Sequence, residues 1–258
     1  MTGQTGAAHA RGRPRLILNS LPKSGTNLLS RVFSGLPGYS RSGTALTYAT
    51  AEGHEDDSSG LFVGVSTPRG IQRDYFATLM RDLEPGHYHV GHLPYSQEAR
   101  DIFNELGFRM IVILRDPRAV VCSFVHFILS RKEHVLYPSF ADEPRPEARI
   151  ELAIRGFPPS PRSSNLGLLP IADCFKSVAD WTSWPGALAV SFEELIGPRG
   201  GGTVEDQAKV LDLIKHYADH PFGNDGPLPA NIIDRVIDGL QDHPTTVVFI
   251  AESSESSL

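Results

Sequence analysis

A lysine, a glycine and two hydroxyl side chains stand together where a short apolar run passes into an apolar-periodic segment. They belong to the stretch PKSGTN and are Lys23, Ser24, Gly25 and Thr26. The N-terminus of a helix offers unpaired N–H groups and the positive end of the helix dipole, which suit an anion. A glycine lets the backbone approach a ligand closely, and the lysine adds positive charge. The stretch predicts a phosphate or sulfate site. An ordinary strand–helix turn with an exposed lysine is the equal alternative.

A second stretch, RDPRAVVCS, places Arg115 at the end of an apolar run and Ser123 eight residues later. An arginine side chain binds phosphate as a planar fork through two parallel hydrogen bonds. The alternatives are a salt bridge with Asp116 for the arginine and simple packing for the serine. The nucleoside-triphosphate loop G-x-x-x-x-G-K-[ST] is absent, because Lys23 precedes Gly25 and no earlier glycine lies in that loop.

An alternation of strands and helices is expected to position these residues. Apolar runs with β-branched residues predict strands, and apolar spacings of three and four predict helices. The expected strands are 16–19, 88–90, 109–114 and 245–250, with 186–195 as a strand followed by an acidic turn. The expected helices are 26–36, 71–83, 97–106, 119–131, 171–181, 204–218 and 230–240. This order indicates a three-layer α/β fold, a central parallel sheet flanked by helices.

Two segments lack such patterns. Residues 38–60 are rich in Ser, Thr, Gly and acidic residues, and we expect a loop. Residues 138–165 carry six prolines and many charges, so we expect a mobile covering segment with one short helix. The predicted organisation is a disordered tail at 1–14, a single domain at 15–250 and a polar tail at 251–258.

The composition narrows the class of protein. The chain has 258 residues, 40% of them hydrophobic, which is enough for one substantial core. A formal net charge of −6 does not suggest a nucleic-acid partner. The two cysteines, Cys122 and Cys174, have no metal-ligand spacing and favour a reducing compartment. The first ten residues lack a signal-peptide core, and no apolar run approaches the roughly 20 residues of a membrane span. We therefore expect a cytoplasmic protein without a membrane partner.

In this order, the two motifs resemble those of the sulfotransferase family that uses 3′-phosphoadenosine-5′-phosphosulfate (PAPS). PKSGTN is similar to the family's loop for the 5′-phosphosulfate, and RDP with the later serine is similar to its 3′-phosphate motif. GHLP at 91–94 and AVSFEEL at 189–195, preceded by Trp181, extend the resemblance over about residues 15–200. The resemblance implies a P-loop-like fold and a sulfotransferase that takes its donor from PAPS.

The resemblance also implies roles for individual residues. Donor contacts are expected from Lys23, Ser24, Gly25, Thr26, Asn27, Arg115 and Ser123. Sulfuryl transfer is an in-line displacement between two oxygens, so the protein mainly positions groups and stabilises charge. Lys23 is expected to neutralise the leaving phosphate oxygen, and His92 to take the acceptor proton, because an imidazole titrates near neutrality. Rival bases remain open in the AEGHEDD loop: Glu52, His54, Glu55 and Asp56.

Three positions depart from the family's pattern. Leu28 stands where cytosolic members carry a tryptophan that stacks on adenine, and Val90 stands where they often carry a lysine. The family's C-terminal R-K-G segment is not found, since Arg235 is the only basic residue after Lys215. A catalytically weak or inactive anion- or nucleotide-binding protein is therefore one alternative, and a phosphoryl-transfer enzyme is another. The expected acceptor is a hydroxyl or amine on a small molecule or glycan, and no metal is expected.

Overall fold

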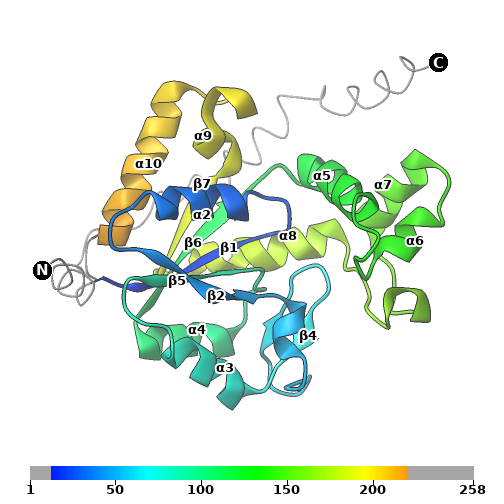
Figure 1. Ribbon diagram of the computed structural model, residues 1–258, viewed down its shortest axis with the longest axis horizontal. Helices are drawn as coiled ribbons and strands as arrows, with labels where there is room; N and C mark the ends of the chain where they lie inside the picture. Colours follow the sequence, from blue (N-terminus) through cyan, green and yellow to red (C-terminus); the bar gives the residue numbers. More distant parts are fainter. Residues whose placement is uncertain (1–12, 220–258) are drawn as a thin grey trace, which may run out of the picture.

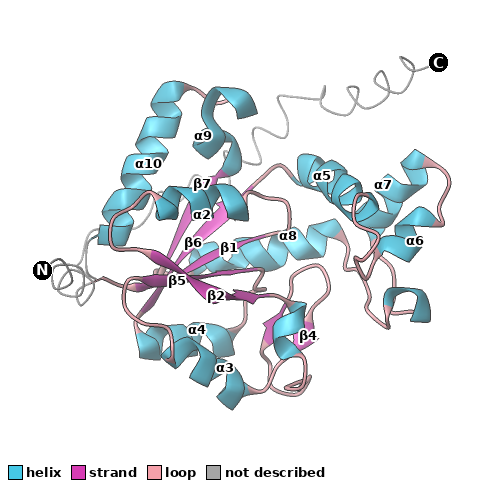
Figure 2. Ribbon diagram, viewed as in Figure 1, coloured by secondary structure: helices cyan, strands magenta, loops and turns pink. Residues whose placement is uncertain are grey.

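The computed structural model describes residues 13–219, and Figures 1 and 2 show a central sheet with helices on both faces. Five strands lie in the order β2-β5-β1-β6-β7, and each neighbouring pair is parallel. They are β1 (Arg15–Ser20), β2 (Ser40–Leu46), β5 (His87–Gly91), β6 (Phe108–Leu114) and β7 (Ala187–Ser191). A small antiparallel pair, β3 (Phe62–Val63) and β4 (Arg69–Gly70), stands apart from this sheet. The expected parallel sheet is confirmed.

The central strands are apolar because both faces of the sheet are covered. All seven residues of β6 are buried, as expected for a parallel strand between two helical layers. One layer holds α2 (Thr26–Ser34) and α10 (Val204–Asp219), which pack against one face through Leu29, Phe33 and Ile214. The other layer holds α3 (Arg73–Arg81), α4 (Gln97–Leu106) and α8 (Ile171–Ala179). In Figure 1, α2 and α10 lie above the sheet and α3 and α4 below it.

A third group of helices stands beside the sheet, at the right of Figure 1. It comprises α5 (Pro117–Leu129), α6 (Tyr137–Ala141) and α7 (Pro146–Arg155). Phe124, Ile128 and Phe140 form its apolar centre. The prediction of one short helix in residues 138–165 was wrong, because prolines at the start of α6 and α7 begin helices there instead of breaking them.

The prediction of a loop at residues 38–60 was also wrong. This segment contains β2 and a 3₁₀ turn at Tyr48–Ala51. The sequence of β2, SRSGTAL, lacks a hydrophobic alternation because the strand lies at the sheet edge and is mostly exposed. The pairing of β2 with β5 is irregular between Arg41 and Ala45, which interrupts the pattern further.

The remaining expected elements agree with the structure apart from their ends. The expected helix at 26–36 ends earlier, at Ser34, followed by the cap residue Gly35. The acidic turn after β7 is a short helix, α9 (Phe192–Ile196). The helix expected at 230–240 and the strand expected at 245–250 lie outside the described residues. Within residues 13–219, no helix is long and apolar enough to cross a membrane.

Candidate active site

The polar residues singled out by the sequence gather at one edge of the sheet. In a parallel sheet the carboxyl ends of all strands meet at the same edge, where ligands commonly bind. Here β1 leads to Lys23, β5 to His92, β6 to Arg115 and β7 to Phe192. These four side chains line one cleft of about 580 Å³. Thr26, Asn27 and Ser123 line the same cleft, so the structure brings together residues of all three motifs.

The loop after β1 has a backbone shape that few residues adopt. Lys23 has φ 72° and Gly25 has φ 105°, both in the left-handed region. A Cβ atom built on Gly25 would lie 2.5 Å from Cδ2 of Phe192 and 3.0 Å from Cδ1 of Ile113. A glycine is therefore required here on two counts, its backbone angle and the close approach of α9. The loop ends at Thr26, the first residue of α2, so the N-terminus of that helix opens at the cleft.

Lys23 is held from both its backbone and its side chain. Its carbonyl oxygen accepts a hydrogen bond from Nη1 of Arg115 at 2.8 Å. Its ammonium lies 4.5 Å from the ring centroid of Phe127, a cation–π contact. Partial burial lowers the pKa of Lys23, and the positive charges of Arg115 and Arg131 lower it further. The cleft therefore favours an anion beside this ammonium, since an anion would offset both effects.

Arg115 and Ser24 carry polar atoms that the protein leaves unsatisfied. The guanidinium of Arg115 lies over the ring of Phe192, 4.2 Å from its centroid. Burial lowers the pKa of Arg115, against the opposing charges of Glu193 and Asp116. Nε of Arg115 and Oγ of Ser24 are buried, and neither has a hydrogen-bond partner among residues 13–219. Buried polar atoms without partners are costly. Arg115 lines the cleft, so its Nε indicates a place where a ligand supplies the acceptor. Ser24 is fully buried and does not line the cleft.

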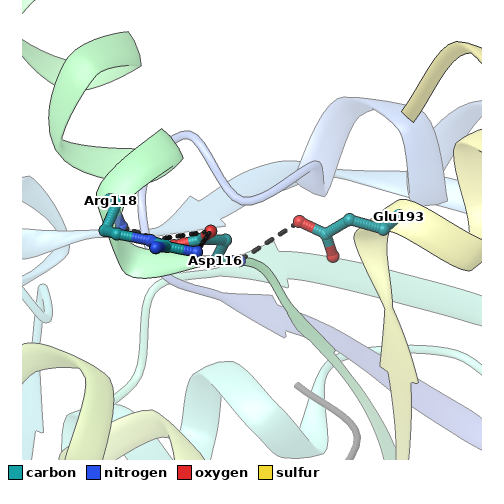
Figure 3. Close-up of polar contacts among 3 residues, drawn as sticks. All are labelled: Asp116, Arg118 and Glu193. Atoms are coloured by element: carbon teal, nitrogen blue, oxygen red, sulfur yellow. Dashed lines mark hydrogen bonds and ion pairs between the residues drawn. The ribbon is translucent and has the colours of Figure 1, made fainter. Parts of the chain in front are cut away.

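The turn that presents Arg115 is fixed by a small polar cluster, shown in Figure 3. Asp116 accepts hydrogen bonds from the backbone N–H of Arg118 at 2.8 Å and from its Nη2 at 2.8 Å. Oε1 of Glu193 accepts a hydrogen bond from the backbone N–H of Asp116 at 3.2 Å. Asp116 therefore caps α5 and pairs with Arg118, whereas the guanidinium of Arg115 is directed to the Lys23 loop. Glu193 ties this turn to α9.

His92 presents one ring nitrogen for chemistry. Its Nδ1 lies 2.8 Å from the backbone carbonyl oxygen of Ser20, which only accepts hydrogen bonds. The proton of the neutral ring therefore lies on Nδ1, and Nε2 carries the lone pair. Burial lowers the pKa of His92 and outweighs the hydrogen bond to Ser20, which raises it. The ring is neutral near pH 7, which is the state that a general base requires.

Three of the four rival bases in the AEGHEDD loop have partners outside the cleft, and the fourth, Glu52, does not line it. The ring of His54 stacks on Tyr75 at 3.6 Å, and Glu55 lies 3.5 Å from Arg69 in an ion pair. Asp56 accepts hydrogen bonds from Ser58, which lower the pKa of its carboxyl group. None of these three side chains lines the cleft.

Sequence reasoning missed several residues that line the cleft, among them Arg41, Tyr48, Phe127 and His134. Nδ1 of His134 accepts a hydrogen bond from the backbone N–H of Leu136 at 3.2 Å, so its Nε2 carries the proton in the neutral ring. The neutral rings of His92 and His134 thus have opposite tautomers, and His92 is the one with a free lone pair at Nε2. No cluster of three or more potential metal-ligating side chains occurs within the described part of the chain.

Comparison with known proteins agrees with this geometry. The sulfotransferase domain family matches residues 13–196. The crystal structure of mouse sulfotransferase SULT7A1 complexed with PAP is similar with a TM-score of 0.50 and 15% identity, over 93% of this chain and 69% of that one. A sulfotransferase from Alicyclobacillus acidocaldarius gives a TM-score of 0.45 and 13% identity, over 89% of this chain and 92% of its own. None of the curated proteins matches the chain in sequence.

The family match covers most of the chain and includes the PKSGTN loop, His92, Arg115 and Ser123. This match confirms the family that the order of the two anion motifs predicted. The chain belongs to the sulfotransferase domain family, whose members take their sulfuryl group from PAPS.

Proposed function

We propose that the protein transfers a sulfuryl group from PAPS to a hydroxyl group of a small acceptor, with Lys23 and His92 as the catalytic residues. One observation carries the proposal. An ammonium with a lowered pKa and a neutral imidazole line the same cleft as a guanidinium with an unsatisfied N–H. Sulfuryl transfer needs a cation that stabilises the leaving group and a base that takes the proton of the acceptor hydroxyl. It also needs a guanidinium or similar group that binds the phosphate of the donor.

The described residues fit the donor. Nε of Arg115 is a buried donor without a partner in the wall of the cleft, and phosphate oxygens are acceptors. The N-terminus of α2 adds N–H groups and the positive end of its dipole. Ser123 lines the cleft on α5, the helix that follows Arg115. We assign the 5′-phosphosulfate to the loop of Lys23 and the 3′-phosphate to Arg115 and Ser123. When bound, PAPS supplies the sulfuryl group.

Two residues of the chain then act during the transfer: one accepts a proton and the other stabilises the negative charge that develops on the leaving group. Nε2 of His92 takes the proton of the acceptor hydroxyl as the acceptor oxygen forms a bond to sulfur. The ammonium of Lys23 neutralises the electron pair that remains on the phosphate oxygen as the old sulfur–oxygen bond breaks. Positioning and charge stabilisation supply the catalysis, because little covalent work is left for the protein.

Transfer of a phosphoryl group from a magnesium nucleotide is the weaker proposal. It needs a carboxylate to hold the ion. No aspartate or glutamate lines the cleft within residues 13–219. Donor binding without turnover is a second candidate, and the sequence observation that favours it is the lack of an R-K-G segment after Lys215.

Cys122 and Cys174 are both free thiols, which supports the proposed cytoplasmic location.

The decisive experiment compares Lys23→Ala with Lys176→Ala. Lys176 is an exposed lysine of α8, paired with Asp180 and away from the cleft. The proteins are incubated with PAPS and a panel of phenols and alcohols, and the sulfated products are detected by mass spectrometry. We expect product with the wild type and Lys176→Ala but none with Lys23→Ala, at equal melting temperature. PAP binding by the wild type without any product would support the binding protein instead.

A further inference from the structure

We propose that the natural acceptor is a hydroxy acid, a small aromatic or apolar hydroxyl compound with a negatively charged group, and that Arg41 pairs with that group. This inference deepens the proposed sulfuryl transfer and rests on it. It assigns the substrate class and a specificity-determining residue outside the donor motifs.

The strand order divides the cleft into two halves. The donor groups follow β1 and β6, while His92 follows β5. Only β2 lies beyond β5 in the sheet, so the half beyond His92 belongs to β2 and the turn after it. Arg41, Thr47 and Tyr48 line the cleft from this half. Because the base must face both the donor sulfur and the acceptor hydroxyl, the acceptor is expected on the β2 side of His92.

The charge of the cleft contrasts with that of the chain. The chain carries a formal net charge of −6. The described residues that line the cleft nevertheless include Lys23, Arg41 and Arg115 and no carboxylate. Donor motifs account for two of these cations and leave Arg41 without a role. Within residues 13–219 the guanidinium of Arg41 has no ion pair or hydrogen bond, so it is free to pair with a ligand.

The strand register indicates the length of acceptor that would reach from His92 to Arg41. Arg41 pairs with Tyr88 across β2 and β5, and His92 follows four residues later along the same direction. At ~3.3 Å per residue this separation is about 13 Å along the strand. Both side chains extend into the cleft and shorten the gap. The remaining space suits a hydroxyl and an acid group at opposite ends of one ring or a short chain.

The chemistry of the walls agrees with such a compound. Apolar contacts come from Ala45, Val65 and Val90, and the ring of Tyr48 also lines the cleft. A protonated amine would enter a cleft without a counter-ion and would meet cations on both sides. We therefore exclude the ammonium class of acceptor, although sequence reasoning kept amines open.

Three phenols that differ only in charge test the inference: 4-hydroxyphenylacetate, 4-methylphenol and tyramine. The measurement is kcat/KM for transfer from PAPS, with binding of each phenol to the PAP complex measured by calorimetry. For the wild type we expect 4-hydroxyphenylacetate to be preferred over 4-methylphenol by about fivefold, the upper range for an exposed ion pair, and tyramine to be poorest. The preference should shrink at high salt.

Variants separate the acceptor role from other roles. Arg41→Ala should abolish the preference for the acid, and Arg41→Glu should make tyramine the better substrate. Arg81→Ala is the matched control, because Arg81 is an exposed arginine of α3 that does not line the cleft. Donor binding should stay within twofold in all of these variants.

Two results would overturn the inference. The first is an equal or better response to 4-methylphenol, or no response to the acid, in a wild type that binds PAP and sulfates at least one of the phenols. The second is a loss of PAP affinity in Arg41→Ala, which would place Arg41 on the donor. Failure of the proposed function looks different, because then the wild type would bind no PAP or release no sulfated product from any of the phenols.

Discussion

Replacing Gly25 by alanine should destabilise the loop of Lys23, and the structure allows the loss of folding free energy to be worked out. The residue has φ 105°, and its new Cβ would lie 2.5 Å from Cδ2 of Phe192. The left-handed backbone costs about 1–2 kcal/mol for a residue with a Cβ, and overpacking costs about 1–3 kcal/mol. The sum of about 2–5 kcal/mol is a large share of the roughly 5–15 kcal/mol that stabilises a typical protein.

Gly53 offers a matched control within the same chain. It also has a positive φ, 77°, but a Cβ there would meet nothing within 4 Å. Gly53→Ala should therefore cost only the backbone part, about 1–2 kcal/mol. The double variant Gly25→Ala/Phe192→Leu should recover part of the packing loss but none of the backbone loss.

The assay is urea unfolding followed by tryptophan fluorescence, with PAP affinity measured on the folded variants. For a protein of this size, the loss in Gly25→Ala corresponds to a fall in melting temperature of about 4–20 °C. PAP binding should weaken as well, because Lys23 and Ser24 stand in the same loop. Equal destabilisation by Gly25→Ala and Gly53→Ala would show that Phe192 does not confine the loop, and the reasoning would fail.

Four further predictions concern the site. Arg115→Ala should weaken binding of 3′,5′-adenosine bisphosphate roughly ten- to more than a hundredfold, far more than binding of adenosine 5′-monophosphate, as measured by calorimetry. His92→Asn should lower kcat about 10²–10⁴-fold with PAP affinity intact. Because the base must be neutral and burial lowers the pKa of His92 below its usual 6.5, wild-type activity should fall with decreasing pH only below that value. Phe127→Leu should lower kcat about two- to fivefold by removing the aromatic partner of Lys23, and Phe127→Tyr should retain it.

Each of these predictions has an outcome that contradicts it. Equally weakened binding of both nucleotides to Arg115→Ala would mean that this residue does not contact the 3′-phosphate. A His92→Asn variant with lower stability and lower PAP affinity would mark a structural histidine. A loss of wild-type activity that already begins above pH 6.5 as the pH is lowered would contradict the lowered pKa of His92. A Phe127→Tyr variant as slow as Phe127→Leu would exclude the cation–π contact as the cause.

The loop of Lys23 and the turn of Arg115, which form the proposed donor side, could be predicted from sequence because their shapes are set locally. The turn at Lys23 and the cap at Asp116 are each set by a few consecutive residues, so their spacing already describes their shape. The strong strand β6 could also be predicted, because all its residues are buried and apolar.

The rest of the cleft, including the proposed acceptor side, could not be predicted for two physical reasons. The edge strand β2 pairs on one side only and carries no apolar alternation that marks a strand. Tyr48, Phe127 and His134 reach the cleft from three separate segments, and only the tertiary fold brings them together. Phe127 belongs to the expected helix at 119–131, but nothing in the local sequence of these three residues shows that they face the cleft.

The position of β2 at the rim of the sheet separates two tasks of the protein. It hydrogen-bonds to one neighbour, β5, whereas β1 and β6, which lead to Lys23 and Arg115, are held on both sides. Substitutions in β2 therefore disturb a single ladder and leave the nucleotide-facing turns in place. We accordingly propose directed evolution of residues 40–49 as a route to new acceptors that leaves the proposed donor site unchanged.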